Sequence, residues 1–211
     1  MLTILVLLLH IETKMQMPKH DFNFKKATQM LNYFARKEGG SINKMKSLKL
    51  IWLTDRLHIR KFGRFISNDT YVAMKFGPVA SNSKDIAENS DFCDDQERQY
   101  GQQYIGRGVS HYYINSLEPI DFTVFSKSDI EALEGIYQSF GSKDQFELSE
   151  ISHLYPEWKK WEPQLKGKAT RFPMEDLDFF ENPASGEHEI FKEDEEGLWL
   201  ARAMFVGEEN H

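Results

Sequence analysis

Apolar residues recur at helical spacing in two consecutive segments near the start of the chain. In the first, from Phe24 to Arg36, they fall every three or four positions, and Gly39-Gly40 follows. In the second, Ser41 or Asn43 can cap a helix that ends at Gly63. The pattern therefore predicts two helices joined by a glycine turn.

The second of these helices is apolar on two nearly opposite sides. We favour a position at the centre of the domain, and the alternative is that one stripe meets a partner. Asp55 projects among the apolar residues, where an unpaired carboxylate costs several kcal/mol. Asp55 is therefore predicted to be buried in a structural polar network rather than catalytic, and His58 and His153 are the other predicted members. The two stripes are Met45, Leu48, Ile51, Trp52 and Ile59, and Leu50, Leu53 and Leu57.

Four basic residues follow one edge of the same helix, beside the second leucine stripe. They are Lys46, Lys49, Arg56 and Arg60. One interpretation is a solvated face whose lysine stems cover apolar surface. The other is a docking rim that orients an acidic partner.

A short apolar run then meets a Gly-Pro pair in YVAMKFGPVASN, from Tyr71 to Asn82. The run predicts a strand, and the pair cannot continue a helix, because the residue before proline is pushed to extended geometry. We expect an elbow into a short helix from Ala80 to Glu88, capped at Ser81 or Ser83.

Later segments complete a fold that is mainly α with a small antiparallel β-sheet, an α+β arrangement in a single domain. Alternating residues in SHYYINSLEPIDFTVF predict strands that pair with YVAMKF. Ser126 or Ser128 with Glu131 predicts the start of a helix that runs through Phe140. A shorter helix from Leu148 to Trp161 is interrupted at proline.

The segment from Met174 to Gly197 is strongly acidic and also carries phenylalanines. Two interpretations stay open: an arm that packs on its own domain, or a segment that folds against a basic partner. The following LWLARAMFV predicts a final buried strand or short helix.

Charge and cysteine content narrow the function classes. The 211 residues carry a net charge of −7, which disfavours broad binding to nucleic acid. The single cysteine, Cys93, excludes an internal disulfide and fits the cytoplasm. We interpret Cys93 as a half-buried thiol, the alternative being a nucleophile with His111 or His153 as base. The pattern indicates no metal site, cofactor or membrane span; residues 1–20 are interpreted as an extension or an over-extended start.

The first half of the chain resembles a known family. The segment NYFARKEGGSINKMKSLKLIWLTDRLHIRKFGRFISNDTYVAMKFGPVASN is similar to the Panacea antitoxin domain of SocA-like proteins from bacteria and phages. The likeness extends, more weakly, through FSKSDIEALEGIYQSFG and LSEISHLYPEWKKW. It indicates a domain over residues 21–165, with an acidic arm over 166–211.

The resemblance implies an antitoxin rather than an enzyme. Such proteins neutralise a toxin encoded by an adjacent gene, and some deliver it to a protease. The expected toxin-binding surface combines the basic edge with the elbow. A hydrolase that uses His153 with Asp55, or a mobile-element accessory protein, is the alternative. The predicted surface consists of Lys46, Lys49, Arg56, Arg60, Lys75, Phe76, Gly77 and Pro78.

Overall fold

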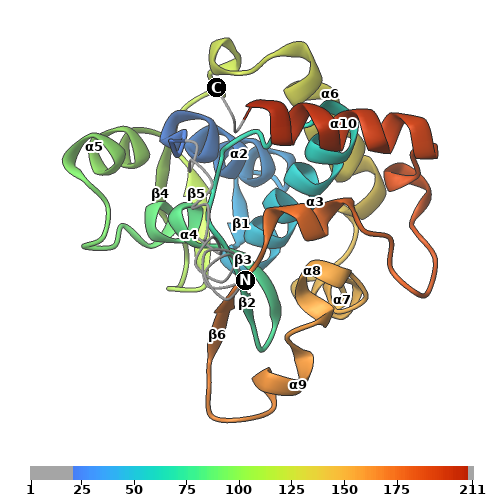
Figure 1. Ribbon diagram of the computed structural model, residues 1–211. Helices are drawn as coiled ribbons and strands as arrows, with labels where there is room; N and C mark the ends of the chain where they lie inside the picture. Colours follow the sequence, from blue (N-terminus) through green and yellow to red (C-terminus); the bar gives the residue numbers. More distant parts are fainter. Residues whose placement is uncertain (1–20, 209–211) are drawn as a thin grey trace, which may run out of the picture.

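The computed structural model describes residues 21–208, which form a mainly helical fold with two small antiparallel sheets (Figure 1). This confirms the predicted fold class, and the interpretation of residues 1–20 lies outside the described residues. The larger helices are α2 (Phe24–Lys37), α3 (Lys44–Phe62), α5 (Asp95–Tyr104), α6 (Lys127–Phe140) and α10 (Glu195–Glu208). The shorter ones are α4 (Ser81–Glu88), α7 (Gln145–Ser152), α8 (Pro156–Lys159) and α9 (Glu162–Leu165), with 3₁₀ turns η2 (Phe122–Val124), η3 (Asp176–Phe180) and η4 (Glu189–Phe191).

Helix α3 lies at the centre of the molecule, in contact with α2, α6, α7 and α10 (Figure 1). The Asn43 side chain accepts from the amides of Met45 and Lys46, and Gly63 ends the helix at φ 65°. Every residue from Lys46 to Arg60 is buried. Both apolar stripes therefore face the interior, which confirms the central interpretation of this helix.

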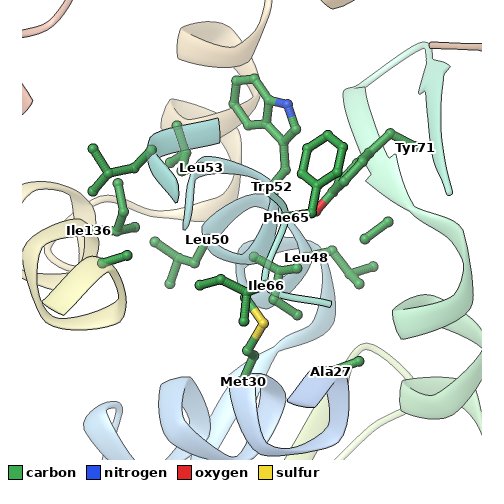
Figure 2. Packing of buried hydrophobic residues seen from close by; sticks show 14 of the residues in the cluster. Ala27, Met30, Leu48, Leu50, Trp52, Leu53, Phe65, Ile66, Tyr71 and Ile136 are labelled. Atoms are coloured by element: carbon green, nitrogen blue, oxygen red, sulfur yellow. The ribbon is translucent and has the colours of Figure 1, made fainter. Parts of the chain in front are cut away.

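The core forms where α3 meets its neighbours. Figure 2 shows Leu48, Leu50, Trp52 and Leu53 of α3 within this packing. Met30 comes from α2 and Ile136 from α6, while Phe65 and Tyr71 close the other side. A helix surrounded in this way leaves its polar residues no route to water, so each needs a partner inside the protein.

Strand pairing differs from the predicted arrangement. One sheet has the order β1-β5-β4 and the other β3-β2-β6. The segment SHYYINS thus does not pair with YVAM, and that prediction was wrong. The actual neighbours of YVAM are the adjacent GPVA, which folds back on it, and RFP from far along the chain. The strands are β1 (Ser41–Asn43), β2 (Tyr71–Met74), β3 (Gly77–Ala80), β4 (Ile105–Arg107), β5 (Tyr113–Ser116) and β6 (Arg171–Pro173).

The Gly-Pro junction is a hairpin rather than a simple elbow. Gly77, at φ 97°, opens β3, a conformation that glycine adopts without strain. Helix α4 follows directly, close to the predicted helix. Its cap is not Ser81 or Ser83: the Asp69 carboxylate accepts from the amides of Asn82 and Ser83, both at 2.8 Å. A carboxylate twelve or more residues away thus caps the helix, which local spacing does not reveal.

The acidic C-terminal segment packs back onto the protein. Phe179, Phe180 and Phe191 are buried, and α10 lies against α3. Of the two open predictions for LWLARAMFV, the helix is correct. In Figure 1 this orange-to-red part of the chain lies in front of and above α3.

Candidate functional site

Asp55 is fully buried on α3 and is held by three donors. Its carboxylate accepts from the Ile66 amide at 2.7 Å, the Ser67 hydroxyl at 2.9 Å and the Tyr71 hydroxyl at 2.7 Å. Burial raises the pKa of Asp55, and these hydrogen bonds oppose the rise. The predicted burial and bonding of Asp55 are confirmed; its role is to fasten the loop after α3 to the helix.

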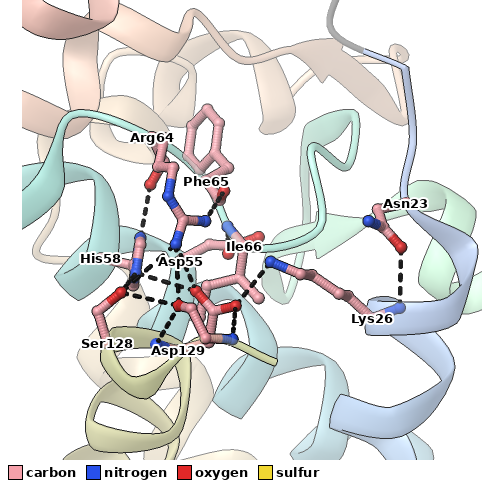
Figure 3. A network of polar contacts seen from close by, with 10 residues as sticks. Asn23, Lys26, Asp55, His58, Arg64, Phe65, Ile66, Ser128 and Asp129 are labelled. Atoms are coloured by element: carbon pink, nitrogen blue, oxygen red, sulfur yellow. Dashed lines mark hydrogen bonds and ion pairs between the residues drawn. The ribbon is translucent and has the colours of Figure 1, made fainter. Parts of the chain in front are cut away.

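A second cluster surrounds His58, one turn further along α3 (Figure 3). His58 Nδ1 donates to the Arg64 carbonyl at 2.8 Å, and Nε2 lies 3.1 Å from both Ser128 Oγ and Asp129 Oδ1. Lys26 and Arg64 pair with the same carboxylate. Burial alone would raise the pKa of Asp129, but hydrogen bonds from His58, Lys26 and the Ser126 amide hold it below its usual range.

The cluster also fixes the start of α6. Ser126 and Asp129 form its capping box, rather than the predicted pairing with Glu131, because Asp129 stands at the third helical position. Three elements, α2, α3 and α6, thus meet at one carboxylate. His58 thus forms its hydrogen bonds in a cluster around Asp129, separate from the hydrogen bonds of Asp55, rather than in one network with Asp55 and His153.

A third cluster joins α3 to the C-terminal segment. Arg56 donates to both oxygens of Glu157 at 2.9 and 2.8 Å and to Glu187 at 2.8 Å, and its guanidinium lies 4.4 Å from the centre of the Tyr155 ring. Both bonds to Glu157 come from Nη1, while Nη2 donates to Glu187 and to the Glu181 carbonyl at 2.8 Å, so the two terminal nitrogens bind different partners. Both Arg56 and Glu157 are fully buried.

Arg60, one turn later, binds the end of η3. It donates to the Phe179 and Phe180 carbonyls at 3.1 and 2.8 Å and to Asn182 Oδ1 at 2.7 Å. Carbonyls at a helix end have no partner within the helix, so the arginine satisfies them. Arg60 therefore anchors the acidic segment to the protein.

These contacts correct the prediction of an exposed basic edge. Arg56 and Arg60 are at most 1% exposed, and Lys46 is buried against Glu38 and the Gly141 carbonyl. Neither the solvated face nor the docking rim exists for these three residues. Because α3 is surrounded on all sides, the basic residues beside the second leucine stripe are buried together with that stripe.

Lys49 differs from the other three, because it lies at a large groove beside the β2–β3 hairpin. This hairpin groove has a volume of about 1370 Å³. Its described lining comes from the hairpin, the start of α3, the loop before β5 and the chain from α7 to residue 170. The apolar part of the lining includes Met45, Leu48, Phe76, Tyr112, Phe146 and Leu165.

The hairpin is held rigidly beside the groove. Lys49 Nζ donates to the Pro78 carbonyl at 2.7 Å, the Ser149 hydroxyl to that of Phe76 at 3.0 Å, and Trp158 Nε1 to that of Met74 at 2.8 Å. The Phe76 side chain at the tip is 55% exposed. A large aromatic side chain on a fixed backbone is a typical contact residue of a binding surface.

The four predicted elbow residues lie with Lys49 at this groove; Lys75 and Phe76 are exposed, whereas Gly77 and Pro78 are buried. His153 lines it as well, with its ring stacked on Trp158 at a centroid distance of 3.9 Å. His153 therefore does not join the Asp55 network, and that part of the prediction was wrong. The sequence places His153 after α7, where no periodicity indicates its neighbours.

The alternative catalytic pairs are not assembled among the described residues. Asp55 is occupied by Ile66, Ser67 and Tyr71, and no hydrogen bond joins it to His153. Cys93 is buried, and burial raises the pKa of its thiol, which disfavours the nucleophilic thiolate. The interpretation of Cys93 as an inert thiol therefore fits its surroundings.

Residues 21–208 contain no group of three or more His, Cys, Asp or Glu side chains placed to hold a metal ion. Their helices also include none with the length and apolar character that crossing a bilayer requires.

Comparison with protein families places these features in a known group. The family model described as "Antitoxin SocA-like, Panacea domain" matches residues 48–159, which is more than half of the chain. The chain belongs to the SocA-like antitoxin family. The Panacea domain thus includes most of α3, the hairpin and α7, and so the main walls of the hairpin groove. Comparisons with curated proteins and with solved structures gave no match.

The Panacea match, over residues 48–159, is shorter than the domain expected from the sequence over residues 21–165. It also ends before the acidic segment that Arg56 and Arg60 bind. Sequence reasoning missed Glu157 and Glu187 as partners of these arginines. The available signal was compositional: an acidic, phenylalanine-rich segment follows a domain that carries buried arginines.

Proposed function

We propose that this SocA-like protein neutralises a cognate protein toxin by binding it directly in the hairpin groove. The observation that supports this most is the groove itself, which is large, apolar and built mainly from the Panacea domain. Ligand sites in proteins are typically concave and lined by apolar residues with a few polar ones. The residues retained from the predicted surface are Lys49, Lys75, Phe76, Gly77 and Pro78, of which Lys75 and Phe76 offer exposed side chains and the other three are buried lining of the groove.

A groove of this kind suits one part of a larger contact. A stable protein–protein interface buries about 1,200–2,000 Å² in total, with apolar anchors at its centre and a polar rim. Phe76 supplies an exposed anchor, and Lys75 stands beside it with Nζ 5.7 Å from the Phe76 ring centre. The groove and its lip therefore fit a protein partner better than a small substrate.

The proposed role is binding without catalysis, in the cytoplasm, by a protein that contacts neither nucleic acid nor membrane. The family supports a toxin as partner in general terms. Within the described residues, the side chains of the Asp55, Arg56 and His58 clusters form hydrogen bonds inside their own cluster. They do not converge on the groove as a set of catalytic groups would.

The test is co-expression with the toxin encoded by the adjacent gene. The double variant Lys75→Glu/Phe76→Ala is expected to abolish rescue of growth and co-purification, because it removes the anchor and reverses the neighbouring charge. The matched control is Lys127→Glu/Phe92→Ala, which makes the same exchanges at two exposed side chains outside the groove. This control should rescue fully.

Full rescue by the folded groove variant would overturn the proposal. The same cultures show whether neutralisation proceeds through proteolysis. A toxin whose half-life shortens when the antitoxin is present indicates delivery to a protease, whereas an unchanged half-life in a stable complex indicates neutralisation by binding alone.

A further inference from the structure

The hairpin groove is a basic concavity in an acidic protein. Six lysines and two glutamates are among its described lining residues, although the whole chain carries a net charge of −7. Glu88 pairs with Lys44 and Lys84, and Glu162 with Lys166. No described carboxylate pairs with Lys49, Lys75 or Lys168. Positive charge without a counter-charge is therefore concentrated in the groove.

Lys49 is the unusual member of this set, since it is only 2% exposed. An ammonium group has three donors, and the structure shows one acceptor, the Pro78 carbonyl at 2.7 Å. Burial lowers the pKa of Lys49 well below its usual value. A charged lysine at this position thus lacks the partner that burial normally requires.

His153 lines the same groove and also has an unpartnered nitrogen. Its Nε2 is buried and has no hydrogen-bond partner among the described residues. Burial lowers the pKa of His153, and the charge of Lys49 lowers it further; Lys159 acts in the same direction, whereas Glu150 and Glu162 act against it. Among the described residues, Lys49 thus has one acceptor for three donors and His153 Nε2 has no partner.

We propose that Lys49 and His153 form a carboxylate-binding site in the hairpin groove, and that it receives an aspartate or glutamate side chain from an acidic, apolar segment of the toxin. The carboxylate supplies the missing acceptor for both groups, and the apolar walls take the neighbouring side chains. This inference rests on the proposed function, from which it takes the protein partner.

Binding of this kind has a measurable proton balance. A carboxylate beside Lys49 and His153 favours their charged forms, so complex formation takes up protons at neutral pH. A segment held only by its apolar side chains takes up none. Proton uptake thus separates a carboxylate anchor from simple apolar docking.

The test uses the full chain and two labelled twelve-residue peptides. One intersperses aspartate and glutamate with leucine and phenylalanine, and the other carries asparagine and glutamine in place of the acids. The acidic peptide is expected to bind at least about 10-fold more tightly, since a hydrogen bond to a charged group is worth about that factor or more. Lys49→Met should remove this preference while leaving the affinity for the amide peptide unchanged.

Two variants keep the result interpretable. Lys49→Met exchanges a buried amine for an apolar chain of similar length, but it also removes the donor of the Pro78 carbonyl. The melting temperature of the variant is therefore measured first, and both peptides are assayed well below it. Lys127→Met, at an exposed lysine, is the matched control and should keep the acidic preference. Calorimetry in phosphate and in Tris should show proton uptake for the wild type and less uptake for Lys49→Met.

Three outcomes overturn the inference. Lys49→Met could still prefer the acidic peptide, or it could lose affinity equally for both peptides. The wild type could also bind a twelve-nucleotide DNA strand more tightly than the acidic peptide. Failure here is distinguishable from failure of the antitoxin role. If rescue of growth depends on Phe76 but the wild type shows no preference for the acidic peptide, only the carboxylate site is refuted. If the wild type prefers the acidic peptide and Lys49→Met does not, but the wild type fails to rescue growth from the toxin, only the antitoxin role is refuted.

Discussion

The buried charged side chains at the two ends of α3 differ in the partners that they find within the chain. Towards its C-terminal end, both oxygens of Asp55 and both terminal nitrogens of Arg56 are hydrogen-bonded within the chain. Towards its N-terminal end, Lys49 has one carbonyl acceptor and faces a groove. The Nε of Arg56 is buried without a partner in the described part of the chain, but the charge of its guanidinium is matched by Glu157 and Glu187. Burial therefore has two meanings: charged groups paired with one another indicate structure, and a buried amine without a counter-charge beside a groove indicates an external partner.

The strongest test of the structural end is Arg56→Ala. It leaves the buried Glu157 carboxylate without its counter-charge and frees the carbonyls of the C-terminal segment. We expect a loss of about 3–5 kcal/mol in the free energy of unfolding. Urea unfolding measures it, with Arg107→Ala, on an exposed residue, as the control. A loss below about 1 kcal/mol would show that the cluster is not needed for stability.

A smaller loss is expected for Asp55→Ala, about 1–3 kcal/mol, because three donors lose their acceptor but no opposite charge is left buried. Tyr71→Phe removes one of the three hydrogen bonds and should cost less than Asp55→Ala. Thermal melts of the two variants check this order. Equal melting temperatures for wild type and Asp55→Ala would contradict the structural role.

The smallest expected effect is on the pH dependence of stability, through His153 at the groove. His153 has a folded-state pKa below its usual value of 6.5, so the unfolded chain binds a proton that the folded protein does not. Its contribution to stability is present above pH 6.5 and is lost as the pH falls towards the folded-state pKa. His153→Phe keeps the stacking on Trp158 and removes the titration.

The free energy of unfolding of wild type and His153→Phe is compared between pH 7.5 and 5. The wild type should lose more stability on acidification than the variant. Parallel pH profiles would mean that His153 titrates normally, and the distinction between the two ends of α3 would then rest on Lys49 alone.

Much of the fold followed from local patterns. The spacing of apolar residues from Phe24 to Gly63 determined two helices and the central place of the second, because a helix apolar on two sides must be covered on both. The same logic identified Asp55 as a buried, bonded carboxylate. Part of the candidate site was also predictable, because the Gly-Pro junction drew attention to Lys75 to Pro78.

Tertiary structure alone decided the rest. Arg56, Arg60 and Lys49 share one edge of α3 and a basic side chain, so no sequence pattern separates them. Helix α8 and the returning C-terminal segment supply the two arginines with partners. Likewise, β2 pairs with β6 across about a hundred residues, and Asp69 caps α4 from outside the helix. Periodicity reports which face of an element is buried, whereas the partner on that face is fixed by contacts between residues far apart in the chain.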